Sequence, residues 1–242
     1  MIRSLTTRYL GAFAFATALA TALPGPAEAR CRLALVLGLD VSASVDAREY
    51  RFLRDGTAAA LTSDAVRQAF DALGGVHLHV FEWSGRDQQQ VIAPWTALDG
   101  EGALDAVASS IAGHVRSTAE YPTALGAALG FASNQLAEGP MGCERLVIDI
   151  AGDGENNHGF APRHAYDAFS FAGVTVNGLV VAGASDTVVD YYRSEVLRGP
   201  DAFLEVAAGY SDFEETMKRK LLREVLPRGL VLRDGRLAAI HP

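Results

Sequence analysis

The sequence contains few cysteines and no cluster of like charges. Its 242 residues include two cysteines, too few for a cysteine-based zinc site or for a disulfide-dense scaffold. It has no run of five or six like charges and a formal net charge of −8, so it lacks the clustered Lys and Arg of a nucleic-acid-binding surface. Hydrophobic residues make up 49% of the chain, which excludes a disordered protein and suffices for the core of one globular domain.

The motifs of several enzyme classes are also missing. The sequence has no G-x-S-x-G elbow, no phosphate-binding P-loop and no H-E-x-x-H zinc motif. Phosphotransferases with an aspartyl nucleophile carry a second acidic residue two positions after it, but here Ser42 stands two positions after Asp40. The sequence therefore favours binding over catalysis and predicts that the protein is not an enzyme.

The first 29 residues have the order of a secretory signal peptide. Arg3 and Arg8 form a short basic region, residues 9–23 are apolar or small, and a Pro-Gly-Pro break precedes Ala27-Glu28-Ala29. A membrane anchor is the alternative, but about 15 apolar residues are fewer than the roughly 18 to 20 that a spanning helix needs. We expect cleavage after Ala29 and an exported mature chain, periplasmic or secreted, that does not insert into the membrane.

Strand-like and helix-like patterns alternate through the rest of the chain. Strands are predicted at residues 32–39, 76–83, 91–95, 145–151, 174–181 and 203–207, and helices from about 46, and at 98–115, 123–138, 162–172 and 211–225. Capping boxes at Asp46/Glu49 and Ser211/Glu214 mark two of the helix starts. This alternation predicts an α/β fold, a three-layer doubly wound, Rossmann-like domain at residues 30–226 with a mostly parallel sheet. Residues 227–242 are expected to form a tail or a small hairpin.

Hydroxyl and carboxylate side chains follow the predicted buried strands. Asp40, Ser42 and Ser44 come directly after the first strand, Asp153 lies between two glycines after the 145–151 strand, and Thr123 begins a helix. Ligands of such sheets bind at the carboxyl ends of the strands, so these groups are expected to meet. Two carboxylates and three hydroxyls suit Mg²⁺ or Mn²⁺ rather than a soft metal.

Each of these residues also has an ordinary structural explanation. Ser42, Ser44 or Thr123 alone could cap a helix, and Asp153-Gly154 alone could form a turn. Their occurrence together at successive strand ends favours a shared metal site, which we take as the prediction.

These residues resemble a known motif. The D-x-S-x-S at Asp40, Ser42 and Ser44, the threonine ahead of Ala-Leu-Gly at Thr123, and the Asp-Gly at Asp153 are similar to the metal-ion-dependent adhesion site (MIDAS) of von Willebrand factor type A (vWA) domains. By this resemblance, Ser42 and Ser44 would ligate the ion directly, Thr123 directly or through water, and Asp40 and Asp153 directly or through bridging waters.

Longer stretches of the sequence indicate one particular group within this superfamily. VIDIAGDGENN at 147–157, VTVNGLVV at 174–181 and YYRSEVLRGPDAFLEVA at 191–207 resemble DUF1194, an uncharacterised group of exported bacterial proteins within the vWA superfamily. The superfamily resemblance implies a central parallel sheet with one short antiparallel edge strand, expected at residues 91–95.

The predicted site suggests a receptor for an acidic side chain. Two carboxylates only just balance a divalent cation, and Mg²⁺ tends to keep exchangeable waters, so an open position would attract an Asp or Glu of a protein partner. The residues expected near the same edge that could form the partner-binding rim are Trp83, Tyr121, Glu155, Asn156 and Asn157. The alternative is that the two aromatic residues pack in the core and that the polar loop has no special function. The alternatives are a structural module with a vestigial metal site and, less favoured, a metal-dependent hydrolase.

The two cysteines offer an independent test of this topology. Cys31 lies nine residues before Asp40, and Cys143 lies ten before Asp153. If the aspartates lie at the ends of neighbouring parallel strands, the cysteines lie level at the opposite ends, because each strand rises about 3.3 Å per residue. An oxidising compartment would then favour a disulfide, the alternative being two unpaired buried thiols.

Overall fold

The computed structural model describes residues 30–183, 187–225, 230–233 and 236–239, and the predicted signal peptide lies outside the described residues. The strands are β1 (Leu33–Asp40), β2 (Val76–Trp83), β3 (Gln89–Ala97), β4 (Arg145–Gly152), β5 (Val174–Val181), β6 (Leu204–Ala207), β7 (Leu230–Arg233) and β8 (Arg236–Ala239). The helices are α1 (Ala47–Thr62), α2 (Asp64–Leu73), α3 (Ala103–Ala112), α4 (Leu125–Glu138), α5 (Pro162–Ala168), α6 (Thr187–Tyr191), α7 (Phe213–Val225), the π-helical turn η1 (Tyr192–Val196) and the 3₁₀ turn η2 (Tyr210–Asp212).

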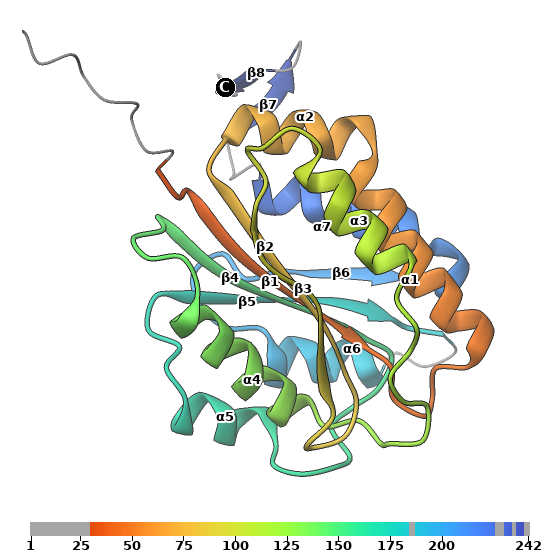
Figure 1. The fold of residues 1–242 in the computed structure, drawn as a ribbon. Helices are drawn as coiled ribbons and strands as arrows, with labels where there is room; N and C mark the ends of the chain where they lie inside the picture. The colour runs from red at the N-terminus through yellow and green to blue at the C-terminus, as the bar shows by residue number, and fades with distance from the viewer. Residues whose placement is uncertain (1–29, 184–186, 226–229, 234–235, 240–242) are drawn as a thin grey trace, which may run out of the picture.

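A six-stranded sheet forms the middle of the domain (Figure 1). Its strand order is β3-β2-β1-β4-β5-β6, and all neighbours are parallel except β3, which runs antiparallel to β2 at one edge. Helices cover both faces, so the predicted three-layer α/β fold is confirmed. The predicted edge strand is also present, although it is longer than expected. Strands β7 and β8 form a separate antiparallel pair.

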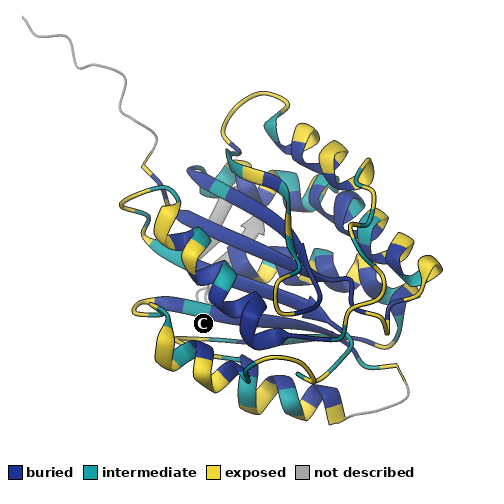
Figure 2. Ribbon diagram, turned by 60° about the horizontal axis from the view of Figure 1, so that its bottom comes forward, coloured by how far each residue is buried: buried dark blue, intermediate teal, exposed yellow. Residues whose placement is uncertain are grey.

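The sheet is buried on both faces, which gives the domain two apolar cores (Figure 2). Every residue of β1 is buried, with Leu35 in the core under α1, α2, α3 and α7, and Val36 in the core under α4, α5 and α6. A strand enclosed in this way has a continuous apolar sequence, because both of its faces meet helices. Among the described residues, no helix combines the length and the apolar character needed to cross a membrane.

Several element boundaries differ from the prediction. The helix expected at 211–225 begins at Phe213, because Ser211 lies in the turn η2 and does not cap the helix. The helix expected at 98–115 is confined to α3, since β3 extends to Ala97 and Gly102 adopts a left-handed φ of 75° just before the helix. Helix α5 ends at Ala168 rather than at 172. The capping box of Asp46 and Glu49 is confirmed.

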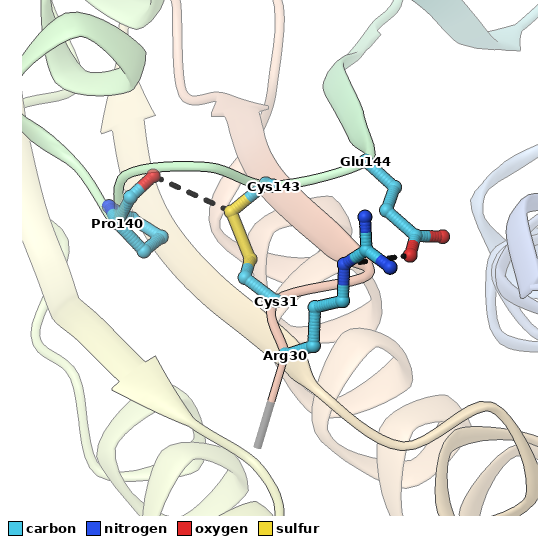
Figure 3. The surroundings of a disulfide bond; sticks show 5 residues. All are labelled: Arg30, Cys31, Pro140, Cys143 and Glu144. Atoms are coloured by element: carbon cyan, nitrogen blue, oxygen red, sulfur yellow. Dashed lines mark hydrogen bonds and ion pairs between the residues drawn. A yellow bond between two sulfur atoms is a disulfide. The ribbon is translucent and has the colours of Figure 1, made fainter. Parts of the chain in front are cut away.

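The amino ends of β1 and β4 are joined by a disulfide between Cys31 and Cys143 (Figure 3). The strands run parallel from this point, with Leu33 beside Arg145, and Arg30 forms an ion pair with Glu144 at 3.3 Å next to the disulfide. The bridge closes a loop with a sequence separation of 112 residues, and closing a loop of this length typically stabilises a protein by about 2–4 kcal/mol.

A group of buried charges joins α7 to the sheet. The Lys220 ammonium lies 2.7 Å from Asp149 Oδ1 of β4 and 2.9 Å from Glu224 Oε1 one turn further along the helix. Asn177 of β5 donates a hydrogen bond of 2.8 Å to the same Glu224 oxygen. Burial alone would lower the pKa of Lys220, but Asp149 and Glu224 outweigh it and hold that pKa above its usual value. The ammonium therefore stays charged, whereas burial and the charge of Glu224 raise the pKa of Asp149 well above its usual value.

We predict that Lys220→Met lowers the free energy of unfolding by about 3–5 kcal/mol, because it leaves two carboxylates buried without their cation. Urea unfolding followed by circular dichroism measures this change. The matched control is Lys218→Met, which alters a partly exposed lysine of the same helix and should change stability by less than about 0.5 kcal/mol. Equal stability of the two variants would show that the buried lysine does not anchor α7.

Candidate metal centre

The register of the sheet brings the predicted site residues to one edge. Asp40 is the last residue of β1, and its neighbour Leu39 pairs with Ala151 of β4, so the two strands end side by side. Asp153 follows Ala151 by two residues and therefore emerges beside the Asp40 loop. The third segment precedes α4, where the Ala124 amide donates to the carbonyl of Ser84 after β2.

The three segments are linked by a chain of hydrogen bonds. The Thr123 hydroxyl donates to Ser42 Oγ at 3.2 Å, and Ser42 Oγ lies 3.1 Å from Ser44 Oγ. Ser44 Oγ donates to Asp153 Oδ1 at 2.7 Å. The structure therefore brings together all five residues predicted from the sequence, with the serines between the two carboxylates.

The Asp40 carboxylate is buried and only partly satisfied. It has no solvent exposure, its Oδ1 accepts a hydrogen bond of 2.8 Å from the Ser42 amide, and its Oδ2 has no hydrogen-bond partner among the described residues. Burial, followed by the nearby charge of Asp153, raises the pKa of Asp40 from 3.8 to about 7. An orphaned, desolvated carboxylate oxygen is costly in a folded protein and requires an explanation.

Two glycines make room for this arrangement. A Cβ at Gly152 would lie 2.9 Å from Asp40 Oδ2 and 2.6 Å from the Tyr192 hydroxyl, and one at Gly154 would lie 3.1 Å from Thr123 Oγ1. Larger residues at either position would therefore crowd the oxygen cluster. The close approach explains why Asp153 stands between two glycines.

Two buried tyrosines face the carboxylates, and the sequence patterns did not identify them. Burial, then the charges of Asp40 and Asp153, raises the pKa of Tyr192, and burial followed by the same two charges raises the pKa of Tyr210. Their hydroxyls have no hydrogen-bond partner within the part of the chain that the structure describes. Tyr192 lies in η1 and Tyr210 in η2, two turns that sequence periodicity does not reveal.

A second set of residues, outside the oxygen cluster, stabilises the loop after β1. The Arg116 guanidinium donates hydrogen bonds of 2.8 Å and 2.9 Å to the carbonyls of Val41 and Ser42. The next residue, Ser117, donates its amide to Glu82 Oε1 at 2.7 Å, and Glu82 is buried in β2. These bonds hold the backbone of the Asp40 loop against the sheet, although none of their side chains belongs to the oxygen cluster.

The predicted partner-binding rim is only partly exposed. Trp83 is wholly buried in the core under α4, so its place on the rim was predicted wrongly, because an aromatic residue that ends a central strand packs inward. Tyr121 is 43% exposed and Glu155 is exposed. Asn156 and Asn157 have supporting contacts, since their side-chain oxygens accept hydrogen bonds from the amides of Gly126 and Thr123.

The donor chemistry of the cluster fits a hard divalent cation. All five side chains offer oxygen, and the free Oδ2 of Asp40 lacks a partner that a cation would supply. Among the residues that the structure describes, no group of three or more His, Cys, Asp or Glu side chains could hold a metal ion, so the serine and threonine hydroxyls are essential to any site here. Without these hydroxyls, the cluster would have two carboxylates to hold an ion.

Comparison with solved structures defines the class of fold. The mussel byssus proximal thread matrix protein 1 (PTMP1) with a zinc-occupied MIDAS motif has a TM-score of 0.62 and 16% identity, over 81% of this chain and 48% of that chain. A von Willebrand factor type A structure from Catenulispora acidiphila has a TM-score of 0.60 and 14% identity, over 84% and 48%. The pilus adhesin SpaC from Lactobacillus rhamnosus GG, in its open conformation, has a TM-score of 0.55 and 13% identity, over 81% and 30%. The fold is that of a vWA domain, and the chain spans about half or less of each of these proteins.

Within this class, the chain belongs to the family described as "Protein of unknown function (DUF1194)", whose family model matches residues 30–229. The resemblance to DUF1194 and to the vWA superfamily that the sequence motifs indicate is therefore confirmed. A search of curated proteins found no match.

We predict that Asp40→Asn stabilises the metal-free protein at high pH. Folding raises the pKa of Asp40 from its ordinary 3.8 to about 7, so the contribution of this group to stability is present below about pH 4 and lost as pH rises through about 7. The asparagine keeps an acceptor for the Ser42 amide and removes the desolvated charge. We expect a gain of about 2–4 kcal/mol near pH 8 and less than half of that gain near pH 5.

Urea unfolding in the presence of a chelator, at both pH values, measures this gain. Asp71→Asn, an exposed aspartate of α2, is the matched control and should change stability by less than about 0.5 kcal/mol at either pH. An equal effect of Asp40→Asn at the two pH values would refute the assignment of the cost to the buried charge.

Proposed function

We propose that this protein is a divalent-cation-dependent, adhesion-type binding module that captures an acidic side chain of a protein partner. The observation that carries the proposal is the convergence of two carboxylates and three hydroxyls, one of the carboxylates being that of the wholly buried Asp40, whose Oδ2 has no hydrogen-bond partner among the described residues. Asp40, Ser42, Ser44, Thr123 and Asp153 would hold Mg²⁺ or Mn²⁺. When bound, the ion would supply a Lewis-acidic position for a carboxylate.

The charges of the site favour an anionic partner group. The hydroxyls of Ser42, Ser44 and Thr123 are neutral, so Asp40 and Asp153 alone would balance the divalent charge and leave no excess negative charge to repel a carboxylate. Ser44 is exposed and Asp40 is buried, so the cluster opens to solvent on the Ser44 side. Exposed Tyr121 and Glu155 would then contact the partner around the captured side chain.

The solved structures with this fold support a binding role. One is named a pilus adhesin, and another is a byssus matrix protein with a zinc-occupied MIDAS motif. For this chain we propose Mg²⁺ or Mn²⁺ because its donor atoms are all oxygens, which hard cations prefer. We also propose that the mature protein acts outside the cytoplasm, since its sequence begins with a predicted signal peptide and the structure contains a disulfide.

A structural module with a vestigial metal site is the second candidate. It is favoured by one observation, the pKa of about 7 at Asp40, which would let a proton instead of a cation neutralise the buried carboxylate. Binding and competition measurements distinguish the two candidates.

We predict that the protein binds Mg²⁺ or Mn²⁺ and that the site residues determine the affinity. Calorimetric titration should detect binding that Asp40→Ala and Asp153→Ala abolish, because each removes half of the balancing charge. Ser44→Ala should weaken it by about tenfold, equivalent to about 1.4 kcal/mol. Because a cation requires ionised Asp40, affinity should fall about tenfold for each pH unit below about 7.

Controls for this titration are Ser109→Ala and Asp71→Asn, which alter exposed residues outside the cluster and should bind as tightly as the original protein. Circular dichroism should show that every variant is folded. Unchanged affinity in both Asp40→Ala and Asp153→Ala would remove the proposed site.

We further predict that partner capture requires the cation and the site together. In a cross-linking pull-down from a periplasmic extract, the protein should retain a partner with Mg²⁺, lose it with chelator and regain it when Mg²⁺ is restored. An excess of a glutamate-containing peptide should compete, and its glutamine counterpart should not. A partner retained equally by Asp153→Ala and in chelator would contradict capture through the metal.

A further inference from the structure

A second candidate site lies at the opposite end of the sheet from the metal centre. A cavity of about 290 Å³ opens at the amino ends of β4 and β5, beneath the last turn of α7, and we call it the α7 cavity. Its walls include Arg145, Asn177, Phe203, Arg223 and Glu224. Arg145 begins β4 while Asp153 follows its end, so the strand's eight residues, about 26 Å, separate this cavity from the metal centre.

The α7 cavity contains a buried acceptor without a donor. Glu224 is 1% exposed, and its Oε1 accepts from both Lys220 and Asn177. Its Oε2 has no hydrogen-bond partner among the described residues, and Arg145 Nη2 lies 3.9 Å from it. A buried carboxylate oxygen in this position lacks the donor that its desolvation requires.

Guanidinium groups line the same cavity. The side chain of Arg145 is 37% exposed, and its Nη1 donates a hydrogen bond to the backbone carbonyl of Glu224, which leaves its other N–H groups for a ligand. Arg223 stacks over the Phe203 ring at 4.0 Å and pairs with Glu205 at 3.0 Å. Planar guanidinium groups with free N–H donors are suited to carboxylates, which they bind in a bidentate manner.

We propose that the α7 cavity binds a small zwitterion of the α-amino acid class. The ligand's ammonium would donate to Glu224 Oε2, and its carboxylate would accept from Arg145. Leu146 and Val147, which also line the cavity, give the ligand's side chain an apolar wall. A ligand with one charge would satisfy only one of the two groups, whereas a zwitterion satisfies both and adds no net charge to a partly buried site.

The experiment screens the full chain, in chelator, against each standard L-amino acid by thermal shift, and then measures the best ligand by calorimetry. We expect saturable binding that Glu224→Gln and Arg145→Gln each weaken by about tenfold or more, since each removes one charged partner. Arg193→Gln, an exposed arginine of η1 outside the cavity, is the control and should bind like the original protein.

Derivatives of the same amino acid separate the two contacts. The N-acetyl form lacks the ammonium, so it should bind weakly, and Glu224→Gln should not weaken its binding further. The methyl ester lacks the carboxylate, so it should also bind weakly, and Arg145→Gln should not weaken its binding further. If Glu224→Gln does not fold, the two derivatives and the Arg145→Gln variant still test the proposal. Binding of no amino acid, or equal affinity for the parent and its N-acetyl form, would overturn the proposal. Because the assay contains no divalent cation, its outcome is independent of the metal centre.

Discussion

The parallel pairing of β1 with β4 is the constraint on which the rest of the structure depends. This register places Leu33 beside Arg145 and Leu39 beside Ala151. At one end it brings Cys31 and Cys143 to a Cα–Cα distance of 4.5 Å, where the disulfide forms. At the other end the same register places two aspartates side by side. A shift of one residue would turn every side chain of β1 to the other face and separate both pairs.

Fixed strands alone do not position the hydroxyl groups of the site, because Ser42, Ser44 and Thr123 lie on loops. The loop after β1 is held by backbone contacts on three sides. Val41 donates its amide to the carbonyl of Trp83, Ala43 donates to that of Tyr121, and the Arg116 guanidinium donates to two carbonyls of the loop. The loop is therefore held before any ligand arrives, and pre-organisation of this kind lowers the entropic cost of binding.

The sequence was sufficient to predict the sheet and the meeting of the five oxygen-bearing side chains at its edge, but it was insufficient to predict the residues that surround them. The bounds 76–83 and 174–181 match β2 and β5, because buried strands give continuous or alternating apolar runs between clear breaks. Helix α2 follows α1 after a single residue, Ser63, and apolar spacing does not reveal so short a break. Trp83, Tyr192 and Arg116 act through contacts with residues far away in the chain, which no local pattern records.

The two buried charge clusters differ in one respect that bears on function. Around Lys220, the chain supplies the cation itself, so Asp149 and Glu224 are held by an ammonium within 3 Å. Burial raises the pKa of both Asp149 and Asp40, but around Asp40 no described residue provides a cation. A protein that can neutralise buried carboxylates with lysine at one position could do so at another. That the chain surrounds Asp40 with hydroxyls and glycines instead supports our proposal that its counter-ion comes from outside the chain.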